Sequence, residues 1–144
     1  MISTEERVVT TTSTTTGPVE RPDTRTWLTE RISAEVGVMI GATWYVLFMI
    51  ATGLEPRATG PNPTWAVVLS FVFLGALVVT AAGLLARRRW GLLASLGAAG
   101  IFTAFSVACP ISGHHGLAPW WFGQMACALG LVGVSAFALA RARA

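Results

Sequence analysis

The chain has 144 residues, of which 53% are hydrophobic and only 12% are charged, with a formal net charge of +3. A soluble domain usually carries about 25% charged residues, so this chain lacks the charge that would keep its surface in water. Its two cysteines are too few for a disulfide scaffold. The composition therefore argues against a soluble or disulfide-stapled domain and predicts an integral membrane protein.

The N-terminal segment differs in composition from the rest of the chain. Residues 1–26 are polar and include nine threonines, so they offer few apolar groups to offset the entropy of ordering. We expect them to form a disordered cytoplasmic tail. Residues 27–35 place apolar and charged side chains at roughly helical spacing, which predicts an interfacial segment lying along the membrane surface.

Four apolar stretches follow, each between 19 and 23 residues long and free of Asp, Glu, Lys and Arg: 36–54, 64–86, 90–109 and 119–140. A helix crosses a bilayer core with about 20 residues, and it satisfies its own backbone hydrogen bonds there. The last two stretches are separated by prolines, glycines and histidines, which are turn signals. We predict an all-α polytopic membrane protein whose residues 36–144 form a compact bundle of four transmembrane helices.

The distribution of basic residues predicts the orientation of these spans. Nine of the ten arginines fall on one side of the predicted membrane, and Arg57 alone falls on the other. Arginine-rich segments stay in the cytoplasm, so we expect cytoplasmic termini and extracytoplasmic loops at 55–63 and 110–118. Five of the six tryptophans fall at span ends, which supports the same register. Arginine without lysine, beside abundant Ala and Gly, is typical of a GC-rich bacterial genome and hence of a bacterial inner (plasma) membrane.

Small residues recur every fourth position in three of the spans. The pairs are Gly37 with Gly41, Gly100 with Ala104, and Ala126 with Gly130. Such ridges let helices approach closely, which is how helices associate in lipid. They predict helix packing, either within this bundle or against a partner.

The loop between the last two spans holds the residues best suited to metal chemistry. Cys109, His114 and His115 carry thiol and imidazole groups, which bind zinc and copper. Trp120, Gln124 and Cys127 follow helical spacing along one face of the last span and are possible supporting residues. The hypothesis is a metal or haem-type site, with the cofactor unknown. The alternative is that the histidines are interfacial, the tryptophans are membrane anchors and Cys127 is a packing residue.

The two cysteines are expected to be free thiols. Pro110 disfavours helical structure at Cys109, which places Cys109 near the outer surface. Cys127 lies eight residues into the last span, roughly 12 Å deeper, which is too far for a disulfide.

The functional classes follow mainly from what the spans lack. No Asp, Glu, Lys or Arg lies deep in a span, which argues against pumps and proton-coupled transporters. No catalytic motif is present, so no catalytic residues are assigned. We expect a structural, accessory or assembly subunit whose partners are the lipid bilayer and a larger membrane complex or a second copy, with no nucleic acid. The alternatives are the metal- or cofactor-binding protein and an oligomeric small transporter, whose cavity would be lined by Thr43, Thr103, Ser106 and Gln124.

Overall fold

The computed structural model describes residues 24–56, 62–113 and 116–142, and this part of the chain is all-α. Its helices are α1 (Thr24–Thr29), α2 (Ala34–Leu54), α3 (Thr64–Leu85), α4 (Arg89–Ile111) and α5 (Pro119–Arg141). The four long helices begin and end within two residues of the predicted spans. The predicted all-α bundle of four long apolar helices is therefore confirmed.

The outward faces of the long helices are apolar. All four helices are long and apolar enough to cross a membrane. Large hydrophobic side chains such as Val38, Phe71 and Phe122 are exposed on them. Exposed apolar surface of this extent favours lipid over water, so the chain is a multi-pass membrane protein.

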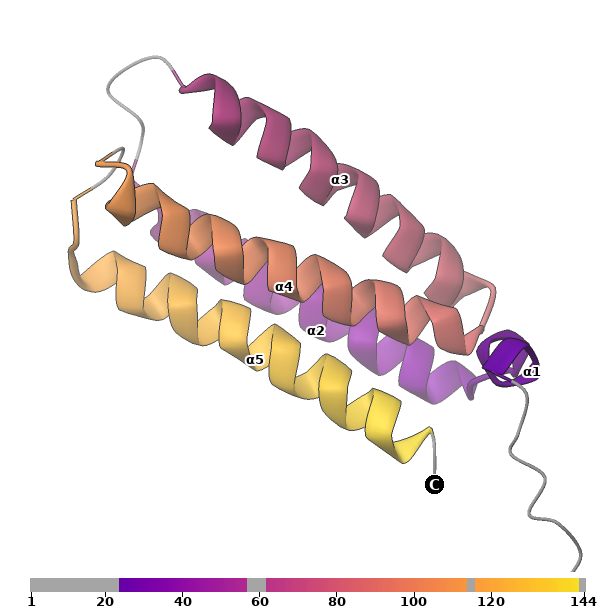
Figure 1. The fold of residues 1–144 in the computed structure, drawn as a ribbon. Coiled ribbons are helices and arrows are strands. Elements are labelled where there is room, and N and C mark those ends of the chain that lie inside the picture. The colour runs from indigo at the N-terminus through magenta and orange to yellow at the C-terminus, as the bar shows by residue number, and fades with distance from the viewer. Residues whose placement is uncertain (1–23, 57–61, 114–115, 143–144) are drawn as a thin grey trace, which may run out of the picture.

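The helices do not pack evenly around the bundle. α4 packs closely against both α3 and α5, and α5 also packs against α2. α2 and α3 meet over a much smaller area, and Figure 1 shows α3 diverging from α4 toward the N-terminal end of α3. The order around the bundle is therefore α3, α4, α5, α2, and the seam between α2 and α3 is its weakest contact.

The core lies on the faces that α4 and α5 turn toward each other and toward α2. Leu92, Ala98 and Ala99 of α4 and Ala128 of α5 are fully buried, and Leu131 is 1% exposed. Most of these side chains are small, so the helix backbones can approach closely, as association in lipid requires.

Two glycines hold α3 against the first turn of α4. A Cβ on Gly83 would lie 2.4 Å from the Cα of Gly91, and one on Gly91 would lie 2.5 Å from the carbonyl carbon of Gly83. Real Cβ atoms do not come that close to backbone, so both positions require glycine. This pair lies outside the small-residue ridges that the sequence analysis singled out.

The connection between these helices is a Schellman turn with arginine at its left-handed position. Arg87 has φ +54°, and its N–H donates to the Leu84 carbonyl at 3.0 Å. The N–H of Arg88 donates to the Gly83 carbonyl at 3.0 Å. These bonds satisfy carbonyls that the end of α3 would otherwise leave free.

The end of the bundle formed by α1, the α3–α4 turn and the C-terminus of α5 is called here the arginine-rich end (Figure 1). The described arginine side chains that belong to it are Arg31, Arg87, Arg88, Arg89 and Arg141. The opposite end, where α2 and α4 end and α3 and α5 begin, is called the loop end.

The segment after α1 is hydrogen-bonded to the α3–α4 turn through its backbone. The N–H of Ile32 donates to the Arg87 carbonyl at 2.8 Å, and the N–H of Arg89 donates to the Glu30 carbonyl at 3.1 Å. The antiparallel pairing of Arg31 with Arg88 lies between these two bonds. The predicted interfacial segment is thus a short helix and an extended strand-like piece attached to the bundle.

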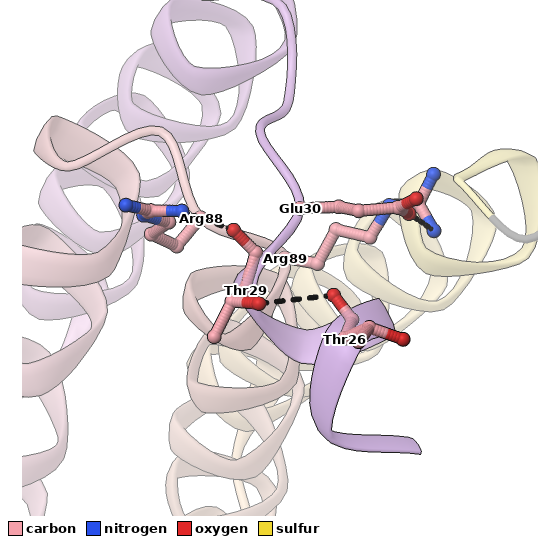
Figure 2. Close-up of polar contacts among 5 residues, drawn as sticks. All are labelled: Thr26, Thr29, Glu30, Arg88 and Arg89. Atoms are coloured by element: carbon pink, nitrogen blue, oxygen red, sulfur yellow. Dashed lines mark hydrogen bonds and ion pairs between the residues drawn. The ribbon is translucent and has the colours of Figure 1, made fainter. Parts of the chain in front are cut away.

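Side chains reinforce this attachment (Figure 2). Glu30 forms an ion pair with Arg89, whose guanidinium also lies 5.6 Å from the centre of the Trp27 ring. Arg88 donates a hydrogen bond to the carbonyl of Thr29 at the end of α1. Figure 2 shows the Arg88 and Arg89 side chains pointing to opposite sides of the segment, so each arginine holds a different part of it.

Candidate functional site

The structure places Cys109 in the last turn of α4. Cys109 is 2% exposed, and the helix continues through Pro110 to Ile111. The expectation that Pro110 would disfavour helix at Cys109 is therefore wrong. His114 and His115 lie outside the described residues, and no group of three His, Cys, Asp or Glu within the described ranges could hold a metal ion. The metal hypothesis thus stays a prediction about the loop.

A tryptophan on α5 explains why α4 continues through the proline. Pro110 has no N–H, so it leaves the carbonyl of Ser106 without its intrahelical partner. The indole Nε1 of Trp121 donates to that carbonyl at 2.8 Å. A neighbouring helix can satisfy a carbonyl freed by proline, which makes proline tolerable inside a transmembrane helix.

The predicted supporting residues lie at different levels of burial on α5. Trp120 is half-buried, whereas Gln124 is 2% exposed and Cys127 lies in the apolar core beside Ala128. The Oε1 atom of Gln124 is buried and has no hydrogen-bond partner among the described residues. Both cysteines are free thiols, as the sequence analysis predicted.

A buried chain of hydrogen bonds links three helices at mid-height. Trp44 of α2 donates through Nε1 to Ser95 Oγ of α4 at 2.8 Å, and Ser95 Oγ lies 2.7 Å from Ser135 Oγ of α5. Ser95 is 0% exposed and Ser135 is 1% exposed. These polar groups are satisfied by one another, so they fix the register of α2, α4 and α5. The sequence analysis missed this link, although Trp44 is the one tryptophan inside a span.

The small residues predicted to pack helices fall into two groups. A Cβ on Gly37 would lie 3.4 Å from the Leu84 carbonyl oxygen, and one on Gly130 would lie 3.3 Å from Leu47, so both glycines face neighbouring helices of this bundle. A Cβ on Gly41 or Gly100 would meet nothing within 4 Å. The exposed members of the set are Gly41, Gly100, Ala104 and Ala126.

The weak seam between α2 and α3 contains three cavities, which we call together the α2–α3 groove. Their volumes are about 600 Å³ at the loop end, about 260 Å³ at mid-height and about 550 Å³ at the arginine-rich end. Gly41, Ala81 and Leu84 line both of the last two cavities, so these two cavities adjoin. Residues that represent the whole groove are Gly41, Phe48 and Thr52 on α2 and Leu74, Leu77 and Ala81 on α3.

Aromatic rings lie beneath the middle of this groove. The rings of Phe48 and Phe73 lie 5.7 Å apart, and those of Phe73 and Phe102 lie 5.5 Å apart and stacked. These contacts join α2, α3 and α4 behind the groove, and Trp44, which donates to Ser95, also lines the mid-height cavity. The middle of the groove is therefore lined mainly by apolar side chains, whereas Glu55, Asn62 and Ser70 line its loop end.

The residues expected to line a transport cavity do not line one of the cavities of the α2–α3 groove. The hydroxyls of Thr43, Thr103 and Ser106 donate back to carbonyls of their own helices. Neither they nor Gln124 line the α2–α3 groove.

Comparison with known proteins finds no matching family model, no similar curated protein and no similar solved structure.

Proposed function

We propose that this protein is an accessory or assembly subunit of a membrane complex, and that its α2–α3 groove receives a transmembrane helix of a partner protein. The observation that carries the proposal is the position of Gly41. It is exposed on the wall of the groove, and a Cβ there would meet nothing within 4 Å. Ala81 stands on the facing wall and is also exposed.

The walls of the groove suit a helix better than they suit lipid. Apolar side chains gain nothing by leaving lipid for one another, so helices associate where small residues allow their backbones to come close. Among the described residues, a Cβ on the second glycine of the Gly37–Gly41 pair would meet no atom of a neighbouring helix within 4 Å. A partner helix that crosses Gly41 and Ala81 would gain close contact with both walls, with small residues on each side.

The attachment of α3 also favours a helix-sized occupant. α3 is joined closely to α4 and only sparsely to α2, so the width of the groove is not set by tight packing of its two walls. Packed helices lie about 8–10 Å apart, so we expect α3 to move away from α2 where the partner helix enters.

The orientation proposed for this subunit follows from the arginines. The arginine-rich end faces the cytoplasm of a plasma membrane, which in a bacterium is the inner membrane. A fluorescent reporter that matures only in the cytoplasm, fused after Ala144, is expected to be fluorescent. A dark fusion that is still inserted at normal levels would reverse the orientation.

Two matched glycine substitutions test the partner groove. Gly41→Leu fills the groove, whereas Gly100→Leu adds the same side chain to an exposed face of α4. Both glycines have open space where the side chain begins, so both variants are expected to fold with normal thermal stability. The measurement is copurification of membrane proteins from native membranes in mild detergent, quantified against the wild-type chain.

The expected result is one protein retained by the wild type and by Gly100→Leu and depleted at least tenfold in Gly41→Leu. A photo-crosslinking residue at position 81 is then expected to label that protein. Equal retention by the two variants would refute the groove as its docking site. Crosslinks only to lipid, or only to a second copy of the chain, would also refute the proposal that the protein is an accessory subunit of a complex.

A further inference from the structure

A second cavity lies at the arginine-rich end, on the side of α2 that faces α5. Its volume is about 520 Å³. Three arginines from separate segments line it: Arg31 after α1, Arg89 at the start of α4 and Arg141 at the end of α5. This cavity is distinct from the α2–α3 groove and plays no part in the partner docking proposed above.

The charges around this cavity do not balance. Glu30 pairs with Arg89, and Arg89 also lies over the Trp27 ring. Arg31 and Arg141 form no ion pair with any carboxylate of the described part of the chain. Within the described residues, the guanidinium groups of Arg31 and Arg141 therefore line the cavity without forming an ion pair.

The deeper wall of the same cavity is apolar. Met39 and Ile40 line it from α2, and Val134 and Phe137 line it from α5. Phe137 is exposed beyond the cavity and lies beneath Arg141, with the guanidinium 5.0 Å from the ring centre. The site thus has a cationic rim and an apolar base that continues along the outer faces of α2 and α5.

We propose that this cavity binds the phosphate headgroup of an anionic phospholipid, with the acyl chains lying along the outer faces of α2 and α5. Guanidinium groups bind phosphate oxygens with two parallel hydrogen bonds, and basic pockets between transmembrane helices are suited to acidic headgroups. The N-terminus of α2, capped by Ser33 at the cavity, adds a favourable dipole. Free phosphate would match the rim alone, whereas a phospholipid also matches the apolar base.

The two unpaired guanidinium groups predict a preference among lipids. A diphosphatidylglycerol, which carries two phosphodiesters, is expected to bind more tightly than phosphatidylglycerol. A zwitterionic phosphatidylcholine is expected to bind weakest, because its choline group repels the arginines.

The test measures lipid retention by the full chain in neutral detergent, using native mass spectrometry with each of these three lipids added. The variants Arg31→Gln and Arg141→Gln are each expected to weaken binding of the anionic lipids about fivefold. Together they are expected to weaken it more than either substitution does alone. The matched control is Arg87→Gln, which removes one charge from the same end but lines the α2–α3 groove.

The control variant is expected to bind as the wild type does, and all variants to unfold at the wild-type temperature in phosphatidylcholine. If Arg87→Gln weakens lipid binding as much as the other variants do, the lipid is attracted only by the overall positive charge of this end, and the proposed site is refuted. Retention that is independent of headgroup charge would also overturn it. Displacement of the lipid by millimolar inorganic phosphate would reassign the cavity to a soluble anion.

Discussion

α3 and the other three long helices are held in the bundle by different forces. α2, α4 and α5 share side-chain hydrogen bonds across their interfaces, through Trp44, Ser95 and Ser135 and through Trp121 and the Ser106 carbonyl. On α3, the hydroxyls of Ser70 and Thr80 donate back to carbonyls of α3 itself. α3 is instead attached by glycine contacts and stacked rings.

This difference matters because polar bonds and apolar packing constrain helices differently in lipid. A buried hydrogen bond forms at one register only, so three helices are locked relative to one another. An apolar side chain is about equally stable against protein and against lipid, so apolar packing holds helices together only where their backbones come very close. α3 is therefore held most closely at the contact between Gly83 and Gly91, and it diverges from α4 toward the loop end (Figure 1).

The largest expected effect comes from breaking the closest backbone contact of α3, at Gly83. Gly83→Leu would place a side chain against the backbone of Gly91, and we expect a loss of about 3 kcal/mol in unfolding free energy. The measurement is unfolding of the purified protein by a denaturing detergent. Hydrogen exchange is expected to speed up in α3 before it does in α5.

The control for this variant lies on the same helix. Gly75→Leu adds the same side chain where a Cβ meets nothing within 4 Å, so its stability is expected to stay near the wild-type value. Equal destabilisation by both variants would show that α3 is not held chiefly at Gly83.

A smaller effect is expected from the bond between Trp121 and the Ser106 carbonyl. Trp121→Phe keeps an aromatic ring but leaves a buried carbonyl unsatisfied, at a cost of about 1.5 kcal/mol. Pro110→Ala restores an N–H that can donate to the same carbonyl, so Trp121→Phe is expected to cost much less in that background. The unfolding free energies of the wild type, the two single variants and the double variant are compared. If the two single effects simply add in the double variant, the Trp121 indole does not compensate for the proline.

The smallest expected effect sharpens the contrast between α4 and α3. Ser95→Ala removes the acceptor of Trp44 and is expected to cost about 1 kcal/mol. Ser70→Ala removes a hydroxyl that bonds only within α3, and it is expected to leave the unfolding midpoint unchanged. Equal midpoints for the two variants would contradict a special role for the link between helices.

The long helices and their ends could be predicted because length, hydropathy and turn residues determine them locally. Even Pro119 stands where a helix start favours proline, at the first residue of α5. The continuation of α4 through Pro110 could not be predicted, because it depends on Trp121, a residue of another helix. Its indole was assigned to the membrane interface, and only the packed structure shows that it donates to Ser106.

The candidate site was less predictable than the fold. A repeat such as Gly37–Gly41 identifies a face of a helix but not the surface that meets it. Gly83 and Gly91 are close neighbours only because the turn between them folds back, so no periodic pattern within one helix reveals them. The arginines were interpreted as a topology signal, and their convergence on one cavity requires the three-dimensional arrangement.

The backbone pairing of residues 30–32 with the α3–α4 turn sets an order of events during synthesis. Arg88 follows its bonding partner Thr29 by 59 positions, so the N-terminal segment emerges long before the turn that will hold it. At about 5–20 residues per second, this delay lasts roughly three to twelve seconds. Throughout that interval α2 and α3 can insert while α1 remains undocked. Docking of α1 therefore reports that the hairpin of α3 and α4 has formed.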